Sequence, residues 1–487
     1  MNKAIQFTIK DLRFYVRNAP MRMPFRFGSI TLTASAILYV RTEIELANGQ
    51  RATGWAADML APKWYDKDPE KGYAESLGQL LEAVRAAGDI YGQIGGESNS
   101  VFRIWQQGYE EMMNWRQQRG INRLMASNGA SLQERALIDA VGIASGLSYH
   151  SLLSSGRLGI ELGALHKELG SMSVDQVIAP TPLSRLSVRH TVGLIDPIRT
   201  VDIAPDGVLG DGLPQSLEDY VVTQGVRYVK IKIGGDAKSD FERLSEISAL
   251  LDEKCRDGYS VTLDGNEQYG DMDALIGLLE RVERELPRMH DALLYIEQPL
   301  DRFVALDRTL APAIRSVSER KPMLIDESDE DLNTFKDAVA LGYRGVSSKA
   351  CKGMIKALAN AALVRHLNGE TDQYFLSAED LTNIPVVGLH QDLTHVAALG
   401  IDHVERNGHH YVRGLDHLSS GERAQCQARH RTLYEDRGDL LTLAINHRQI
   451  NVESLQAPGL GSGDLVDRDA VIPLEDWSMD TLVEGNR

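Results

Sequence analysis

Short apolar segments that each end in one charged residue recur through the middle of the chain, and this recurrence constrains the fold more than any other feature. The steps between successive charged residues are 32, 33, 29, 23 and 30 residues, in the order Lys232, Asp264, Glu297, Asp326, Lys349 and Glu379. Each step has room for one strand, one helix and two loops. Seven such strands, from SVRHTVGL to YFLSAE, predict a parallel (β/α) barrel.

A doubly wound open sheet is the alternative fold for this alternation. In that fold a glycine-rich phosphate-binding turn follows the first strand, and no such turn follows SVRHTVGL. The barrel is therefore the favoured prediction.

The segments on either side of the predicted barrel have other patterns. The first 60 or so residues indicate strands, with a loop over Pro20 to Gly28 and a hairpin turn at Asn48-Gly49. The apolar spacing then becomes helical as far as about Leu165. We expect an α+β capping domain over residues 1–175, the barrel over 176–424, and a tail over 425–487 that packs back on the cap.

Composition restricts the partners of the chain. The net charge is -17, from 52 basic and 69 acidic residues, so neither nucleic acid nor an anionic membrane surface is an expected partner. The three cysteines lie far apart, and no segment has the pattern of a signal peptide or a membrane span. We expect a cytoplasmic protein that binds a small molecule.

Three of the predicted strand ends are acidic: Asp264, Glu297 and Asp326. The carboxyl ends of barrel strands meet at one mouth, where barrel enzymes place their catalytic groups. Carboxylates without His or Cys are hard oxygen ligands, which suit Mg²⁺ better than a transition metal. Their recurrence favours a metal site over isolated salt bridges, because like charges do not gather without a counter-ion.

Lysines mark two further strands. Lys230 and Lys232 are two residues apart on one strand, so their side chains point to the same face. Lys349 ends a later strand, on the opposite side of the barrel if the strands follow in order. Two bases across a metal suit removal of a proton from the carbon next to a carboxylate. A basic lysine needs a pKa lowered from about 10.4 toward about 7 to 8, and the Lys230 ammonium would act in that direction.

The segments VKIKIGGD, LDGNEQY, YIEQPL and IDESD, in this order, resemble the enolase superfamily, and in particular its muconate-lactonizing-enzyme subgroup within the mandelate racemase/muconate lactonizing enzyme family. The resemblance extends over most of the chain. It implies a modified TIM barrel, (β/α)7β, with an N-terminal α+β capping domain. It also implies Mg²⁺ and abstraction of an α-proton from a small-molecule carboxylate. Capped barrels of this kind are often symmetric assemblies, so we expect a homo-oligomer.

The resemblance assigns roles by position. Lys232 matches the first acid/base, Lys349 the second, and Lys230 the partner that contacts the substrate carboxylate and tunes Lys232. The matches to the metal ligands are Asp264, Glu297 and Asp326. The residues that match neighbours of those ligands are Asn266 and Glu327, and Glu379 matches a glutamate that borders the substrate.

The segment after the second lysine departs from the pattern of the superfamily. It usually reads K-x-x-K-x-G-G, whereas this chain has Lys349-Ala350-Cys351-Lys352-Gly353-Met354. Lys352 is therefore a rival for the role of Lys349.

Substrate specificity in this superfamily comes from the cap. The segment PMRMPFRFGS offers Arg22, Phe25 and Arg26 as contacts to the distal part of a substrate. The alternative is that the arginines pair with surface acids and the aromatic ring belongs to the cap core. The adjacent His409 and His410 are expected to face opposite ways on a strand, which favours a loop or core role over a ligand pair.

Three reaction outcomes fit this site: racemisation or epimerisation, dehydration, and cycloisomerisation. A non-catalytic member that keeps the metal site and only binds a ligand is an alternative. A pyridoxal-phosphate barrel is a third hypothesis, but it leaves the acidic strand ends without a purpose.

Overall fold

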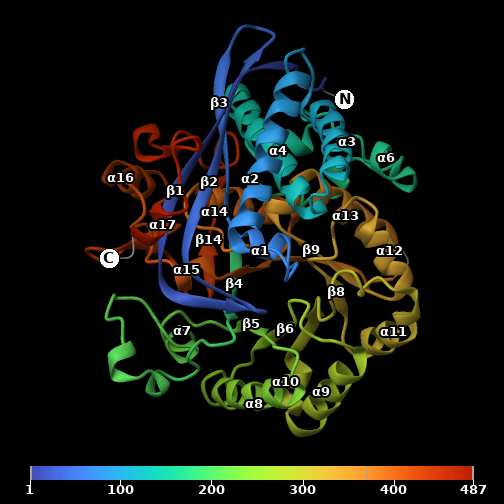
Figure 1. The fold of residues 1–487 in the computed structure, drawn as a ribbon, viewed down its shortest axis with the longest axis vertical. Coiled ribbons are helices and arrows are strands. Elements are labelled where there is room, and N and C mark those ends of the chain that lie inside the picture. The colour runs from blue at the N-terminus through green and yellow to red at the C-terminus, as the bar shows by residue number, and fades with distance from the viewer. Residues whose placement is uncertain (1–2, 370, 485–487) are drawn as a thin grey trace.

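The cap is built on a four-stranded antiparallel sheet in the order β15-β1-β2-β3. The computed structural model describes residues 3–369 and 371–484. Strands β1 (Phe7–Phe27), β2 (Ile30–Leu46) and β3 (Arg51–Met59) form a meander, seen in blue in Figure 1. The turn between β2 and β3 has Gly49 at φ 83°, which confirms the hairpin predicted at Asn48-Gly49.

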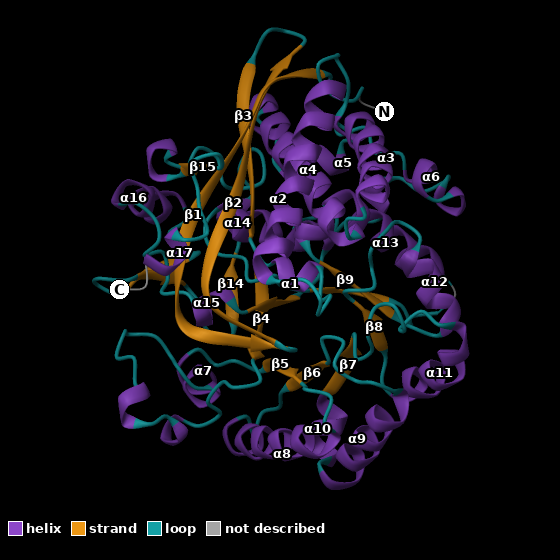
Figure 2. Ribbon diagram, in the orientation of Figure 1, coloured by secondary structure: helices purple, strands orange, loops and turns teal. Residues whose placement is uncertain are grey.

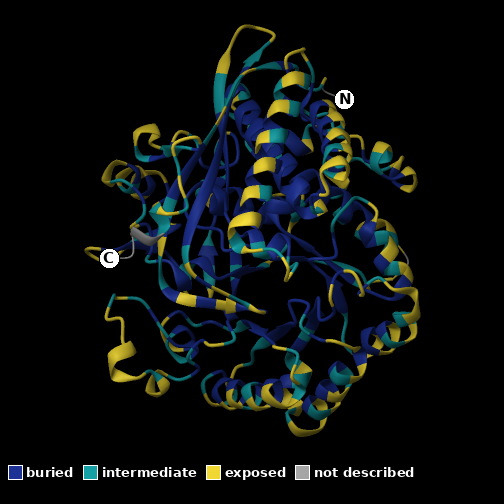
Figure 3. Ribbon diagram, viewed as in Figure 1, coloured by how far each residue is buried: buried dark blue, intermediate teal, exposed yellow. Residues whose placement is uncertain are grey.

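Helices follow the meander in the chain. Their bounds are α1 (Pro62–Tyr65), α2 (Tyr73–Ile94), α3 (Val101–Arg119), α4 (Arg123–Ser145), α5 (Tyr149–Ser154) and α6 (Leu162–Leu165). Two of them, α2 and α4, pack against the strands of the meander. Helix α4 lies directly on β3, where a Cβ on Gly54 would come within 2.2 Å of the Ala136 carbonyl oxygen. Because Gly54 has no side chain, α4 can pack closely on β3. Most of α4 is buried between the cap sheet and the barrel, as Figure 3 shows.

Eight parallel strands close into a barrel in the order β4 to β11, with β11 paired to β4. The strands are β4 (Arg185–Val192), β5 (Tyr228–Lys232), β6 (Ser260–Asp264), β7 (Leu293–Glu297), β8 (Met323–Ile325), β9 (Gly345–Ser348), β10 (Phe375–Ala378) and β11 (His403–Arg406). This confirms the predicted TIM barrel. The eighth strand was not recognised as a segment in the sequence.

Helices connect the barrel strands on the outside, as Figure 2 shows. They are α7 (Leu217–Thr223), α8 (Ala237–Lys254), α9 (Met272–Glu285), α10 (Pro287–Ala292), α11 (Ala311–Arg320), α12 (Thr334–Leu341), α13 (Met354–Leu367) and α14 (Val387–Leu399). Among the described residues, no helix has the length and apolarity needed to cross a membrane.

The segment after the barrel contributes to both sheets. It contains α15 (Gly408–Tyr411), α16 (Ser420–Arg429), β12 (Tyr434–Asp436), β13 (Leu441–Leu443), β14 (Gln449–Asn451), β15 (Ile472–Pro473) and α17 (Thr481–Glu484). Strand β14 pairs antiparallel with β4 of the barrel, and β15 pairs antiparallel with β1 of the cap. The domain boundaries at 175/176 and 424/425 stay a prediction.

One predicted loop is part of a strand. The segment Pro20 to Gly28 was expected to leave the sheet, but β1 continues through it to Phe27. Pairing with β2 shifts register between Pro20 and Phe25 and then resumes, with Phe25 and Phe27 buried on one side. The two phenylalanines give this stretch an apolar face, which keeps it on the sheet despite the prolines.

Candidate active site

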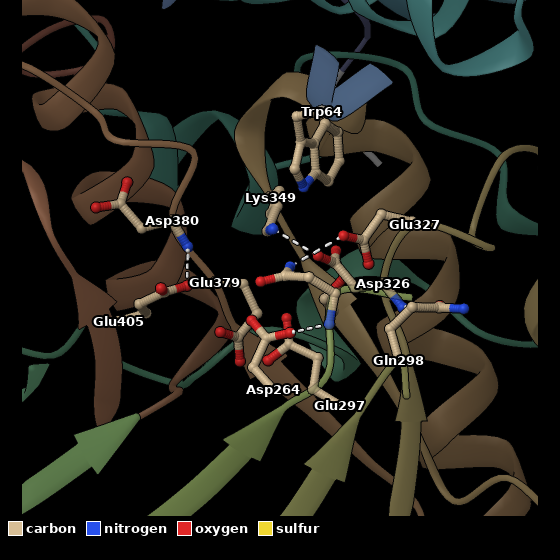
Figure 4. Close-up of polar contacts among 12 residues, drawn as sticks. Trp64, Asp264, Glu297, Gln298, Asp326, Glu327, Lys349, Glu379, Asp380 and Glu405 are labelled. Carbon is tan, nitrogen blue, oxygen red and sulfur yellow. Dashed lines mark hydrogen bonds and ion pairs between the residues drawn. The ribbon is translucent and has the colours of Figure 1, made fainter. Parts of the chain in front are cut away.

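Charged side chains converge at the carboxyl ends of the barrel strands (Figure 4). The strand register places Lys232 of β5 opposite Asp264 of β6, and Asp264 opposite Glu297 of β7. Asp326 follows β8 directly, and Lys349 follows β9. Side chains that lie one after another on the barrel in this way must share one mouth, and the structure brings together the residues that the sequence singled out.

Lys230 lies at the centre of this group, fully buried. Its Nζ is 2.9 Å from Asp264 Oδ2, 2.7 Å from Glu297 Oε2, 2.6 Å from Glu379 Oε2 and 2.9 Å from Glu405 Oε2. Burial alone would lower the pKa of Lys230, but the four carboxylates outweigh it and raise the pKa well above its ordinary value. The ammonium therefore stays charged and holds the carboxylates together.

The two proposed acid/base lysines each pair with a different carboxylate. Lys232 Nζ lies 2.5 Å from Asp264 Oδ2, and Lys349 Nζ lies 2.5 Å from Asp326 Oδ2. The ring of Trp64 in α1 covers Lys349, with its centroid 4.5 Å from Nζ. Burial would lower the pKa of Lys349, but the charge of Asp326 raises it above its ordinary value. In this arrangement the Asp326 carboxylate stabilises the charged form of Lys349.

Lys352, the rival of Lys349, is held more tightly. Its Nζ donates to Ser347 Oγ at 2.6 Å and to the carbonyl of Asp326 at 3.1 Å, and it lies 3.1 Å from Asp329 Oδ2. Lys349 has one carboxylate partner and an aromatic ring above it. The geometry thus favours Lys349 as the lysine that faces the mouth.

The carboxylates differ in their electrostatic environment. Burial and the nearby charges of Asp264 and Glu379 raise the pKa of Glu297 well above its ordinary value. Burial also opposes ionisation of Asp326, but Lys349 and Lys352 lower its pKa well below the usual range. An excess of negative charge is therefore concentrated around Glu297, where a further cation would be most stabilising.

The donor set suits a hard divalent cation. Asn266 Oδ1 and Glu327 Oε2 are buried oxygens without a hydrogen-bond donor among the described residues, and the Lys230 ammonium lies 2.7 Å from Glu297 Oε2. Such oxygens are the ligands that Mg²⁺ prefers. Within the described part of the chain, however, no three or more acidic, histidine or cysteine side chains are arranged to hold an ion, because lysine ammonium groups lie between the carboxylates. A cation at Glu297 would need the Lys230 ammonium to shift.

A covering segment, defined here as Pro62 to Lys67, is fastened over the mouth by buried charges. Lys67 Nζ lies 2.5 Å from Glu267 Oε2, 3.2 Å from Glu327 Oε1 and 2.9 Å from the Asn266 carbonyl. Arg302 pairs with Glu267 and donates to the carbonyls of Trp64 and Tyr65. These contacts hold Trp64 over Lys349.

The other predicted site residues lie in different surroundings. The Asn266 side chain donates to Glu327 Oε1 at 3.1 Å, and its N–H donates to Asp264 Oδ1 at 2.9 Å, so Asn266 links two of the acids. Glu379 contacts Lys230 as described above. Arg22 pairs with Asp211 at 2.6 Å and donates to the His410 carbonyl. The pair with Asp211 agrees with the alternative that the arginines of this segment pair with acids.

The aromatic ring of the predicted cap contacts is also engaged in packing. Phe25 is buried and stacks on Tyr411 with ring centroids 4.1 Å apart. Arg26, between two buried phenylalanines on β1, is exposed. Among the contacts resolved for these three cap residues, none reaches the carboxylates at the mouth.

Two residues of the charge cluster were missed from the sequence. Arg189 of β4 pairs with Glu379, and Glu405 of β11 contacts Lys230 and accepts from Thr191 Oγ1 at 2.7 Å. Arg189 lies inside a strand rather than at its end, so the search for charged strand ends passed over it. Glu405 does precede a loop, and a search for an eighth strand before Asn407 would have found it.

The adjacent histidines belong to a helical turn rather than a strand. His409 and His410 lie in α15, where His410 Nδ1 is 2.8 Å from Tyr220 Oη and Nε2 is 3.4 Å from Asp196. His410 is buried, which agrees with the core role preferred over a ligand pair. The helical turn places both rings near His190 on the outer face of β4.

Comparison with known proteins adds the fold class. No protein-family model matches the chain, and no curated protein matches it. Solved structures do. A mandelate racemase/muconate lactonizing protein from Herpetosiphon aurantiacus has 15% identity and a TM-score of 0.58, with 93% of this chain and 98% of that chain covered.

Two further solved structures were determined with ligands. An enolase from Bradyrhizobium complexed with magnesium and mandelic acid has 15% identity and a TM-score of 0.57, covering 95% of this chain and 96% of its own. A dipeptide epimerase from Enterococcus faecalis complexed with Mg and a dipeptide has 14% identity and a TM-score of 0.56, covering 93% and 99%. At these identities the likeness shows a shared fold: the chain has the capped-barrel fold of mandelate racemase/muconate lactonizing enzyme structures, as its motifs predicted.

Proposed function

We propose that this chain is a Mg²⁺-dependent enzyme that abstracts an α-proton from a small-molecule carboxylate. The observation that supports this most directly is the placement of Lys232 and Lys349. Both ammonium groups are buried at strand ends, and each contacts a different member of the carboxylate group at the barrel mouth. Solved structures of the same fold described as complexes with magnesium lend support to the metal.

Asp264, Glu297 and Asp326 would hold the metal. Bound there, Mg²⁺ would supply positive charge for the enediolate that forms when a carboxylate substrate loses its α-proton. Lys232 and Lys349 belong to β5 and β9, which are four strands apart in an eight-stranded barrel and so lie on opposite sides. One lysine would take the proton and the other would return a proton from the opposite face.

The remaining residues have positioning roles in this proposal. Lys230 would orient the substrate carboxylate, and Glu379 and Glu405 would hold the Lys230 ammonium in place. Trp64 and the covering segment would exclude water from the site. Asn266 and Glu327 would orient the metal ligands through the hydrogen bonds already described.

The proposal leaves three outcomes for the substrate: racemisation or epimerisation, dehydration, and cycloisomerisation. Return of the proton to the opposite face gives the first, and loss of a β-leaving group gives the second. We further propose a cytoplasmic location and a homo-oligomeric assembly.

Solvent isotope exchange tests the proposal before the substrate is known. The protein is incubated with Mg²⁺ in D₂O and a panel of acid sugars, dipeptides and N-acylamino acids, and loss of α-proton signals is followed by proton NMR. We expect exchange with at least one carboxylate, abolition in Lys232→Ala, and dependence on Mg²⁺.

Lys238→Ala is the matched control, because this lysine is 80% exposed and lies 4.0 Å from its one ion-pair partner. It should exchange at the wild-type rate. Mg²⁺ binding without exchange on any carboxylate would contradict the enzyme proposal and support the alternative, a metal-bound ligand-binding member of the same fold. A cofactor absorbance band in the purified protein would support the pyridoxal-phosphate hypothesis instead.

A further inference from the structure

The glycine-rich stretch Pro458 to Gly463 borders a cavity remote from the lysines and carboxylates of the barrel mouth. This tail cavity has a volume of about 670 Å³. The cap contributes Thr53 and Trp55 of β3 and Ile143 of α4, and the segment after the barrel contributes the rest. None of the charged residues of the candidate active site lines it, so its ligand would be a separate one.

Left-handed glycines alternate with other residues in the backbone of this stretch. Gly459, Gly461 and Gly463 have φ angles of 79°, 84° and 55°, so every second residue is left-handed. Where left-handed residues alternate with right-handed helical ones, successive N–H groups form a concavity that can bind an anion. No backbone carbonyl of the described residues accepts a hydrogen bond from the N–H groups of Gly461, Ser462 or Gly463.

The loop is held rigidly in this form from the cap side. Leu460 N–H donates to Asp139 Oδ1 at 2.7 Å, and Tyr149 N–H donates to the Gly459 carbonyl at 3.0 Å. A Cβ on Gly461 would come within 3.0 Å of the Leu455 carbonyl oxygen. Glycine at this position therefore allows both the left-handed φ angle and the close packing against Leu455.

Ser462 and Arg429 are among the polar residues that line the same cavity. Ser462 is 1% exposed, and its Oγ has no hydrogen-bond partner among the described residues. A buried hydroxyl without a partner is costly, and a ligand acceptor would satisfy it. Arg429 lies against the loop, where a Cβ on Gly463 would be 3.3 Å from its guanidinium, and it pairs at 2.5 Å with Asp464, which also lines the cavity. The planar guanidinium carries five N–H donors, so donors remain for a ligand anion.

The opposite wall is apolar. Trp55 is 4% exposed, and Ile143, Ala457 and Pro458 line the cavity beside it. His430 completes the wall with Nδ1 at 3.0 Å from Ser454 Oγ, and burial lowers its pKa to about 4, so the ring is neutral at pH 7. A flat apolar body can pack here while its charged end reaches the loop.

We propose that the tail cavity binds a small molecule with a phosphate or carboxylate group on a flat apolar body. The anionic group lies on the N–H groups of Gly461 to Gly463 with Arg429 and Ser462, and the apolar body lies against Trp55. This site is independent of the proposed function and has no part in proton abstraction.

Binding of simple probes to the full chain tests this assignment. Phenyl phosphate, benzoate, inorganic phosphate and phenol are titrated by calorimetry with EDTA present, and ligand-observed NMR reports contact with the protein. We expect phenyl phosphate or benzoate to bind, with the tighter one identifying the charged group. Inorganic phosphate should bind at least tenfold more weakly than phenyl phosphate, and phenol should give no signal.

Variants locate the binding. Arg429→Gln should weaken binding of the preferred probe at least tenfold and Ser462→Ala at least threefold. Arg413→Gln is the matched control, because Arg413 also lies after the barrel and pairs with Asp439 at the surface; its affinity should equal that of the wild type. Binding should also persist in Lys232→Ala.

Three results would overturn the proposal. The first is that neither phenyl phosphate nor benzoate binds, and the second is that binding survives Arg429→Gln unchanged. The third is that binding disappears in Lys232→Ala, which would place the probe at the barrel mouth. Because the assay uses no turnover, its failure leaves the isotope-exchange test of the proposed function unaffected.

Discussion

Replacing Lys230 by methionine removes the one cation that contacts four buried carboxylates. Asp264 keeps Lys232 as a partner and Glu379 keeps Arg189, so these two remain compensated. Glu297 is left with no cation within ion-pair distance among the described residues. Glu405 retains two hydrogen-bond donors but no other ion pair among those residues.

The expected cost follows from this count. Leaving a buried charge without its partner costs about 3–5 kcal/mol, so Lys230→Met should lower the free energy of unfolding by that amount at pH 7. The loss should shrink as the pH falls. Burial and the like charges of Asp264 and Glu379 already raise the pKa of Glu297, and removing Lys230 raises it further, so protonation of Glu297 as the pH falls removes the uncompensated charge.

Urea unfolding at pH 7 and pH 5.5, with Mg²⁺ or EDTA, measures both effects. A ligand that binds the folded state at 100 times its Kd stabilises it by about 2.7 kcal/mol. Mg²⁺ should stabilise the variant more than the wild type, because it replaces the lost positive charge. Lys238→Met on exposed α8 should change stability by less than about 0.5 kcal/mol. If Lys230→Met unfolds at the wild-type urea concentration at pH 7, the ammonium does not hold the carboxylates together and the reasoning is refuted.

Three further predictions concern the contacts around the site. Glu134→Ala should lower the free energy of unfolding measured in urea by about 1–3 kcal/mol, because this buried carboxylate of α4 accepts hydrogen bonds from the N–H groups of Met354 and Ile355 at the start of α13. An unchanged urea midpoint would contradict a stabilising role for these hydrogen bonds. Arg302→Met should speed amide hydrogen exchange in the covering segment at least tenfold without affecting α8, since it removes the hydrogen bonds from Arg302 to that segment. Equal exchange rates in the variant and the wild type would contradict a role of Arg302 in holding the covering segment. Burial raises the pKa of Asp139 to about 7, so ionisation of this group lowers the stability of the folded state as the pH rises from about 4 to 7. Asp139→Asn should make the decline of stability with pH less steep over this range. An identical pH profile in the variant would show that Asp139 does not titrate there.

The barrel and the core of its site were predictable because both depend on local periodicity. Apolar strands that end in a charge repeat at the length of one β/α unit, and the parallel register then brings Lys232, Asp264 and Glu297 side by side. The eighth strand is harder to recognise because two of its four residues, Glu405 and Arg406, are charged. It therefore lacks the pattern of apolar residues followed by a single charge that marks the other strands.

Contacts between distant segments could not be predicted in the same way. Arg22 was considered both as a substrate contact and as the partner of an acid, and the acid with which it pairs, Asp211, lies 189 residues further along the chain. The direction of the Lys349 pKa shift could not be predicted either, because it depends on the position of Asp326 relative to the ammonium, which residue spacing does not encode. Electrostatic environment is a property of the assembled fold, whereas residue type and strand position can be recognised from the sequence.

The placement of β14 and β15 has a consequence for how the molecule is made. Both strands come from the segment after the barrel, yet one joins the barrel sheet and the other the cap sheet. During synthesis, which runs from the N-terminus at about 5–20 residues per second, the edge of β1 that receives β15 is among the first parts of the chain to emerge. That edge stays unpaired until residues 472–473 leave the ribosome, so a nascent chain halted just after the barrel would expose it to other strands.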